Sequence, residues 1–197
     1  EFVPTTGKTR FTALASGEID MLARNTTWTF SRDVDLKFEF VGVNYYDGQG
    51  FMAKADLGVS SATELDGATV CIQTGTTTEL NLADFFRANN MSYEAVPVET
   101  GAEAVTNYMA GACDVFTTDR SALAARRANM ETPTDHVVLP EIVSKEPLGP
   151  LVRHGDNNWG DVVRWTLNAL ITAEELGVTA ANVAEMAKGT KIPEMNR

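Results

Sequence analysis

Strand and helix patterns alternate through the middle of this chain, and this alternation constrains the fold more than any other feature of the sequence. Apolar runs predict strands over 68–72, 93–98, 115–118 and 137–139, and helical spacing predicts helices over 79–88, 102–110 and 121–130. Repeated strand and helix units are typical of sheets whose strands run parallel and are joined by crossover helices. The sequence therefore predicts an α/β fold with a parallel sheet.

The segments on either side of this central part predict a second α/β body. Before it come the tail of a strand over 1–3, a helix over 8–16, and strands over 19–22 and 38–43; after it come helices over 161–176 and 180–187. The turn-rich segment 45–50 predicts a hinge, and the proline-punctuated segment 140–152 predicts an extended return crossing. We therefore expect two lobes joined by two strands, with 1–50 and 149–197 in the first and 51–148 in the second.

A strand that breaks at Gly75 and enters a helix is the first candidate ligand site. Thr76 and Glu79 have the spacing of a capping box, and the hydroxyls of Thr76 and Thr77 lie where unpaired helix-terminal N–H groups gather. Such a junction can hold an anion or a polar ligand. An ordinary capped helix explains the same pattern equally well.

A second polar segment, 24–32, follows the strand predicted over 19–22. It is rich in short polar side chains and includes Arg32, whose guanidinium can clamp a carboxylate with two parallel hydrogen bonds. Alternatively, Arg32 begins a charged surface loop with Asp33 and Asp35. Two polar strand ends favour one shared ligand.

Composition narrows the class of partner. The 197 residues carry 16 Lys and Arg against 27 Asp and Glu, a net charge of -11, which argues against nucleic acid or an anionic membrane surface as the partner. No apolar run approaches the roughly 20 residues that span a bilayer, and no leader pattern begins the sequence, so we expect a mature, truncated or cytosolic chain. The expected ligand is a small molecule.

The cysteines and histidines suggest a disulfide and no metal. Cys71 and Cys113 each lie at a predicted strand, so they form either a disulfide, which implies an oxidising compartment, or two buried free thiols. His136 and His154 have no ligand spacing with each other or with the cysteines, so no metal site or cofactor is predicted.

Four motifs resemble the periplasmic amino-acid-binding proteins of ABC importers, in the cluster with two hinge strands. The motifs are Asn-Thr-Thr-Trp-Thr at 25–29 with Arg32, Asn-Tyr-Tyr-Asp-Gly-Gln-Gly-Phe at 44–51, Gly-Thr-Thr-Thr-Glu-Leu at 75–80 and Lys-Glu-Pro-Leu-Gly-Pro at 145–150. They look like the general L-amino-acid-binding subgroup of proteobacteria, and the resemblance covers essentially the whole chain. It implies the type II bilobal fold.

The resemblance also implies the roles of individual residues. Arg32 would pair with the α-carboxylate of the ligand, helped by Thr27 and Thr76, and Asp119 would receive the α-ammonium. Asn25 would add a polar contact, and Trp28 would pack over the ligand side chain. The full candidate ligand-binding set is Asn25, Thr27, Trp28, Arg32, Thr76, Thr77 and Asp119. The predicted mechanism is closure of the two lobes around a zwitterion.

The implied function is capture of L-amino acids, broadly and with a preference for polar or acidic ones, and their delivery to membrane permease subunits from the periplasm. Compared with the family pattern, the first strand and helix unit of lobe 1 is absent, so we expect an incomplete first lobe. Alternatives on the same fold are a sensory domain and an enzyme like cyclohexadienyl dehydratase. A small-molecule-binding regulator is a third alternative, but the sequence shows no DNA-binding helix pair.

Overall fold

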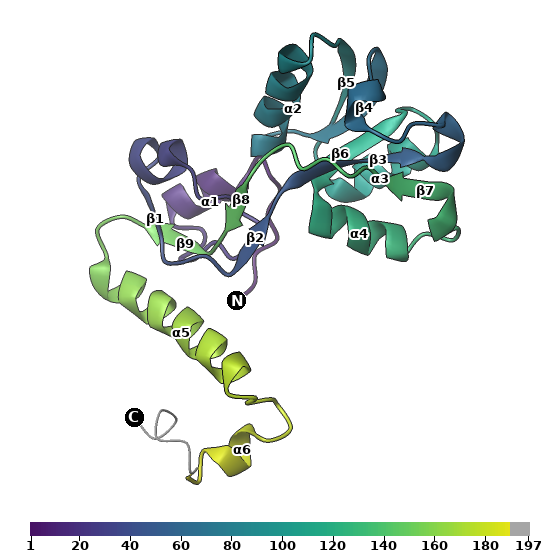
Figure 1. Ribbon diagram of the computed structural model, residues 1–197. Helices are drawn as coiled ribbons and strands as arrows, with labels where there is room; N and C mark the ends of the chain where they lie inside the picture. The colour runs from purple at the N-terminus through teal and green to yellow at the C-terminus, as the bar shows by residue number, and fades with distance from the viewer. Residues whose placement is uncertain (190–197) are drawn as a thin grey trace.

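The computed structural model describes residues 1–189 and has two lobes of unequal size (Figure 1). The larger lobe is built on a five-stranded sheet in the order β5, β4, β6, β3, β7. Its strands are β3 Gln49–Lys54, β4 Ala68–Gln73, β5 Tyr93–Val98, β6 Val115–Asp119 and β7 His136–Val138. Its α-helices are α2 Thr77–Ala88, α3 Gly101–Met109 and α4 Arg120–Ala128. The predicted alternation of strands and helices is therefore present.

The prediction of a parallel sheet is correct for part of this sheet only. Strand β4 pairs in parallel with β5 and β6, but β3 runs antiparallel to both β6 and β7. Strand β3 comes directly from the hinge, without a crossover helix to turn the chain around. It is buried along nearly its whole length, and an apolar run does not reveal the direction of its strand.

Two apolar clusters pack on opposite faces of the sheet. Neighbouring residues of β3 belong to different clusters: Phe51 faces the side covered by α2, and Met52 faces the side covered by α3 and α4. This alternation follows from the period of two along a strand. The three-layer arrangement holds the ends of β4 and β6 in place on the side that faces the smaller lobe (Figure 1). Short 3₁₀ turns at Ala55–Leu57, Ala62–Glu64 and Pro133–Asp135 complete the connections.

The smaller lobe contains α1 Arg10–Ser16, a π-helical turn Ser31–Asp35, and β1 Phe38–Phe40 paired antiparallel with β9 Leu151–Arg153. Its core consists of Leu14, Leu22, Phe38, Phe40 and Leu151. The strands predicted over 1–3 and 19–22 are wrong. The first has no strand partner among the described residues, and the second is reduced to a single bridge between Leu22 and Leu151, because too little sheet lies beside it to form a ladder.

Two short strands, β2 Tyr45–Asp47 and β8 Glu146–Leu148, run antiparallel between the lobes. They correspond to the outward and return crossings expected from the sequence. Residues 26–28 extend this hinge, since the amide of Trp28 donates to the carbonyl of Pro147 at 2.8 Å and that of Gly149 donates to Thr26 at 3.1 Å. The exact lobe boundaries, 1–50 with 149–197 and 51–148, remain a prediction, and residues 190–197 lie outside the described part.

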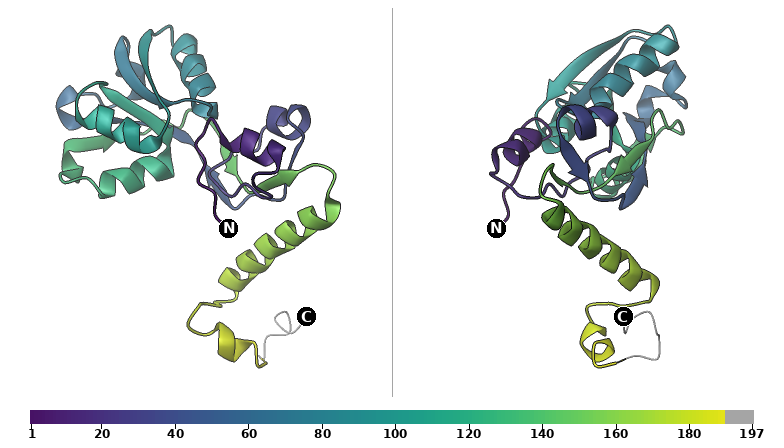
Figure 2. Two further views of the ribbon diagram at one scale, coloured as in Figure 1. Left: turned by 180° about the vertical axis from the view of Figure 1, so that it is seen from behind. Right: turned by 90° about the vertical axis from the view of Figure 1, so that its left-hand side faces the viewer.

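Helix α5, Asn157–Glu175, extends away from both lobes and leads to the short helix α6, Val183–Met186 (Figure 2). Near its start, Val163 packs with Val41 and Val152 of the smaller lobe. Further along, the side chains of Leu170 and Trp165 are 65% and 66% exposed. The apolar contacts that anchor α5 therefore reach from Trp159 to Leu167, whose side chain lies beside Gly42.

Candidate functional site

A polar cavity lies where the carboxyl ends of β4 and β6 face the smaller lobe. Its volume is about 20 Å³, room for about one water molecule. An amino acid needs more space than this, so the lobes must separate for one to enter. The residues that line the cavity are Gly7, Arg10, Arg24, Asn25, Thr27, Gln73, Thr76, Thr77, Thr78, Thr118 and Asp119.

The larger lobe contributes the turn between β4 and α2. Gly75 adopts a left-handed conformation with a φ of +72°, and a Cβ at this position would lie 3.0 Å from the Cα of Lys8 in the smaller lobe. Glycine therefore serves both the turn and the close approach of the lobes. The hydroxyls of Thr76 and Thr77 follow directly, at the start of α2.

The capping box predicted for Thr76 and Glu79 is wrong. The hydroxyl of Thr76 donates backwards to the carbonyl of Gln73 at 2.8 Å, and the Glu79 carboxylate accepts from the amide of Gly75 at 2.7 Å. The tight glycine turn brings these groups closer than the usual capping partners. Both hydrogen bonds hold the turn before α2, and neither side chain caps an N–H group of the helix.

Asp119 ends β6 and carries the negative charge of the cavity wall. Its carboxylate accepts a hydrogen bond of 3.1 Å from the side-chain amide of Asn25, which belongs to the smaller lobe. Burial raises the pKa of the Asp119 carboxyl to about 6. The Asn25 hydrogen bond and Arg10 lower this pKa, and the carboxylates of Asp47 and Glu146 raise it further. An ammonium group placed here would favour the charged carboxylate.

Arg32 lies behind the cavity wall. Its side chain is buried and donates to the carbonyl of Thr27 at 2.8 Å, with the guanidinium 5.0 Å from the centre of the Phe11 ring. Burial lowers its pKa, while the charges of Glu146 and Asp119 raise it. The residue is therefore not part of an exposed loop. Its contact with the ligand carboxylate remains a prediction, because its side chain does not line the described cavity.

Trp28 is also outside the cavity lining. It stacks on Phe40, with ring centres 5.3 Å apart, and its indole N–H donates to Asp33 at 2.6 Å. These contacts hold the ring against the smaller lobe. The structure thus brings Asn25, Thr27, Thr76, Thr77 and Asp119 together around the cavity and leaves Arg32 and Trp28 beside it.

Two arginines of the cavity wall, Arg10 and Arg24, are absent from the predicted set. Arg10 is 3% exposed and donates to the carbonyl of Asn25 at 3.2 Å and to the hydroxyl of Thr26 at 3.1 Å. Burial lowers its pKa to about 9, helped by Arg32 and Arg24 and opposed by Asp119. The group therefore stays protonated at neutral pH. Its Nε has no hydrogen-bond partner among the described residues.

A sequence signal for Arg10 exists in hindsight. Arg10 lies four residues before Leu14, so it shares the buried face of α1. An arginine in an apolar register is a candidate for a buried functional charge. For Arg24, burial lowers the pKa and its guanidinium donates to the carbonyl of Thr5; no comparable periodic signal marks it.

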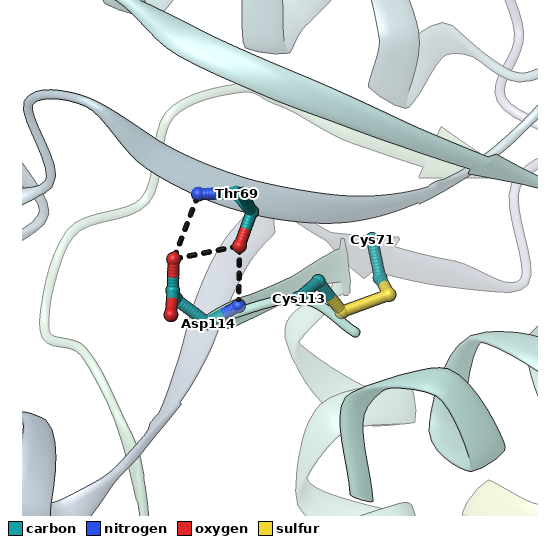
Figure 3. Close-up of a disulfide and its surroundings, with 4 residues drawn as sticks. All are labelled: Thr69, Cys71, Cys113 and Asp114. Carbon is teal, nitrogen blue, oxygen red and sulfur yellow. Dashed lines mark hydrogen bonds between the residues drawn. A yellow bond between two sulfur atoms is a disulfide. The ribbon is translucent and has the colours of Figure 1, made fainter. Parts of the chain in front are cut away.

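Cys71 and Cys113 form a disulfide that ties β4 to the start of β6, with Cα atoms 5.6 Å apart (Figure 3). Next to it, the carboxylate of Asp114 accepts from the amide and hydroxyl of Thr69 at 2.9 and 2.6 Å. Both cysteines are buried. These links fix the alignment of the two strands whose opposite ends carry Thr76 and Asp119.

Residues 1–189 contain neither a candidate metal site nor a candidate membrane-spanning helix. No cluster of three or more His, Cys, Asp or Glu side chains there could hold a metal ion. No helix in the same residues is long and apolar enough to cross a membrane.

The two lobes and paired hinge strands define the fold of type II periplasmic binding proteins. A periplasmic binding protein of an ABC transporter from Brucella ovis, solved with glutathione bound, is 56% identical and superposes with a TM-score of 0.92, covering 100% of this chain and 62% of that one. The resemblance inferred from the motifs is thus confirmed. No protein-family model matches the sequence.

Two curated relatives are named as amino-acid-binding proteins. The glutamate/glutamine/aspartate/asparagine-binding protein BztA of Rhodobacter capsulatus is 64% identical, and the general L-amino acid-binding periplasmic protein AapJ of Rhizobium johnstonii is 56% identical. Each alignment covers 100% of this chain and 58% of the relative. The chain therefore spans a little over half the length of these relatives, which are named as binding proteins and not as enzymes.

Proposed function

We propose that this chain serves as the substrate-binding component of an ABC transporter, capturing L-amino acids between its lobes in the periplasm and delivering them to the membrane permease. The observation that carries the proposal is the meeting of the buried cation Arg10 and the buried anion Asp119 from opposite lobes in one cavity. A zwitterion supplies a partner for each charge when the lobes close on it. The names of the relatives at 52–64% identity support the same function.

We further propose a preference for acidic amino acids and their amides. Arg10 and Arg24 line the cavity with a single carboxylate, Asp119, and behind its wall lie one more cation, Arg32, and one more carboxylate, Glu146. This surplus of positive charge favours a ligand with a second carboxylate. The name of BztA agrees with this class of ligand.

Glutathione is a second candidate ligand. The Brucella ovis relative was solved with it bound, and its γ-glutamyl end has the α-ammonium and α-carboxylate of glutamate. Arg24 is less deeply buried than Arg10, so it could meet the far carboxylate of a longer ligand. Direct competition between glutathione and glutamate tests whether both use the same cavity.

Isothermal titration calorimetry of the refolded, ligand-stripped chain tests the proposal. We expect L-glutamate and L-aspartate to bind with micromolar affinity, roughly 8 kcal/mol, and D-glutamate and L-lysine to bind far more weakly. Arg10→Met should weaken the binding of glutamate more than the binding of glutamine. Arg32→Met should weaken the binding of both ligands equally if Arg32 pairs with the α-carboxylate that they share. Arg87→Met is the matched control, because Arg87 lies exposed on α2 and, within residues 1–189, pairs only with Asp84.

The permease role needs a separate experiment, because a sensory domain would bind the same ligands. Proteoliposomes that contain an amino-acid ABC permease should take up labelled glutamate only when the chain is added with ATP. Recovery of the ligand unchanged by mass spectrometry would set the chain apart from a dehydratase-like enzyme. Binding without uptake would favour a sensory role.

A further inference from the structure

A fully buried carboxylate, Glu146, lies at the end of the hinge nearest the larger lobe. Its side chain is 2% exposed, and the residue belongs to β8, one of the two strands that cross between the lobes. A buried carboxylate is costly unless hydrogen bonds satisfy its oxygens. The partners that Glu146 uses therefore show which parts of the molecule depend on it.

In the part of the chain that the structure describes, four side chains donate to Glu146, and they come from separate segments. One carboxylate oxygen of Glu146 accepts from the hydroxyl of Thr27 and, at 3.2 Å, from the hydroxyl of Thr77. The other carboxylate oxygen accepts from the side-chain amide of Asn81 at 2.8 Å and from the hydroxyl of Ser144 at 2.5 Å. Thr27 lies in the segment of the smaller lobe that extends the hinge, whereas Thr77 and Asn81 lie on α2 of the larger lobe. The carboxylate therefore binds both lobes to the hinge strand at once.

The two threonines are also walls of the cavity. Thr27 and Thr77 line it from opposite lobes, and their hydroxyl oxygens are 3.4 Å apart. Because a carboxylate can only accept, each hydroxyl directs its proton towards Glu146. The carbonyl of Thr27 is in turn held by Arg32 at 2.8 Å. The orientation of both cavity hydroxyls thus depends on a group that does not itself line the cavity.

We infer that Glu146 is a positioning residue for ligand capture, which orients the hydroxyls of Thr27 and Thr77 and couples the hinge to closure of the lobes. This inference rests on the proposed amino-acid-binding function and names a determinant outside the ligand contacts. When the lobes separate, at least one of the bonds to Thr27 and Thr77 must break. When they close on a ligand, Glu146 restores both bonds and stabilises the closed form.

Glu146→Gln tests this role with little change in volume. A glutamine side chain has one acceptor oxygen and one donor NH₂ group. Its NH₂ group must therefore face groups that donate to Glu146 in the parent protein, either the amide of Asn81 or the two threonine hydroxyls. We expect L-glutamate affinity to fall about 10- to 100-fold, mainly through faster dissociation. Spin labels at Ala15→Cys and Ala88→Cys, one on each lobe, should report a longer or broader interlobe distance with saturating ligand than in the parent protein.

Glu141→Gln is the matched control. Glu141 lies in the same return segment, but it accepts from Ser61 and the amide of Ala62 within the larger lobe, at 2.6 and 2.9 Å. Its substitution should change the unfolding temperature without changing ligand dissociation. Thr77→Val, alone and combined with Glu146→Gln, provides a second test: the two changes should be clearly non-additive in glutamate affinity.

The outcomes separate this inference from the proposed function. Parent protein that binds no amino acid would refute the proposed function, and the inference with it. A second outcome would overturn only the inference. In it, the parent protein binds glutamate, and the Glu146→Gln variant has the same ligand dissociation rate and the same interlobe distance as the Glu141→Gln control. Additive effects of Thr77→Val and Glu146→Gln would also overturn it, because independent sites do not share an interaction.

Discussion

At the scale of single residues, Asp119 links ligand binding to folding stability. Burial raises the pKa of its carboxyl from 3.8 to about 6 in the folded chain. A pKa above the unfolded value means that the folded state binds the proton more tightly. Its contribution to stability is therefore fully present below pH 3.8 and is lost as the pH rises through 6. The difference corresponds to roughly 3 kcal/mol.

Asp119→Asn should remove this pH dependence. Without ligand, we expect the variant to be more stable than the parent at pH 7 to 8, by up to about 3 kcal/mol, because no buried charge remains. Near pH 4 the two should be similar. Urea unfolding at several pH values measures the difference, and a parallel pH dependence in both proteins would contradict the assignment to Asp119.

Ligand affinity should depend on the same carboxyl. An ammonium ligand needs Asp119 in its charged form, so we expect L-glutamate affinity to decline about tenfold per pH unit below the pKa of about 6. Calorimetry between pH 5 and 8 tests this. The Asp119→Asn variant should bind weakly at all pH values, and a normal affinity in that variant would exclude Asp119 as the ammonium partner.

At the scale of elements, the disulfide between β4 and β6 holds the two site-bearing strands in register. It closes a loop across a sequence separation of 42 residues. A cross-link of this length stabilises a domain by about 3–4 kcal/mol in the chain-entropy description. The sheet also has its own pairing and core, so we expect the fold to survive without the bond.

Paired substitution Cys71→Ala with Cys113→Ala should lower the unfolding temperature by several degrees and leave glutamate affinity within about threefold of the parent. Thermal unfolding and calorimetry on the same samples measure both effects. Addition of a reductant to the folded parent should act slowly, since both sulfur atoms are buried. A large loss of affinity in the double variant would mean that the disulfide shapes the site directly.

The sequence predicts the bounds of several strands and helices well, but it does not predict the direction of every strand. Strand β5 matches its predicted range of 93–98, and α2 begins only two residues before its prediction, because local periodicity determines both. The direction of β3 was not predictable from its apolar residues, since a reversed strand can show the same pattern. Likewise, the capping box at Thr76 failed because Gly75 changed the local geometry.

At the scale of the whole molecule, the approach of the two lobes is controlled by backbone contacts as well as by charges. A Cβ on Gly75 would lie 3.0 Å from the Cα of Lys8 and 3.1 Å from the carbonyl oxygen of Gly7. Such contacts are with the opposite side of the cavity, and backbone cannot move away as easily as a flexible side chain. The small volume of the cavity reflects the same close approach.

Gly75→Ala should therefore weaken ligand binding more than it weakens folding. The left-handed conformation costs about 1–2 kcal/mol for alanine, and the contact with Lys8 should additionally oppose closure. Gly111→Ala is the control, because Gly111 has a φ of +76° but no atom within 4 Å of its added Cβ. We expect similar losses of stability in both variants and a loss of glutamate affinity in Gly75→Ala alone. Equal affinities would contradict a role in closure.

The sequence by itself determined the strand and helix units of the larger lobe, the two crossings and the polar turn at the end of β4, because each depends on residues close together in the chain. It also indicated Asn25 and Asp119, which the structure brings to one hydrogen bond of 3.1 Å. Only the tertiary structure decided that β3 runs antiparallel, that Arg10 is a cavity wall and that Glu146 joins both lobes. These features depend on desolvation and on contacts between distant segments, which local patterns do not encode.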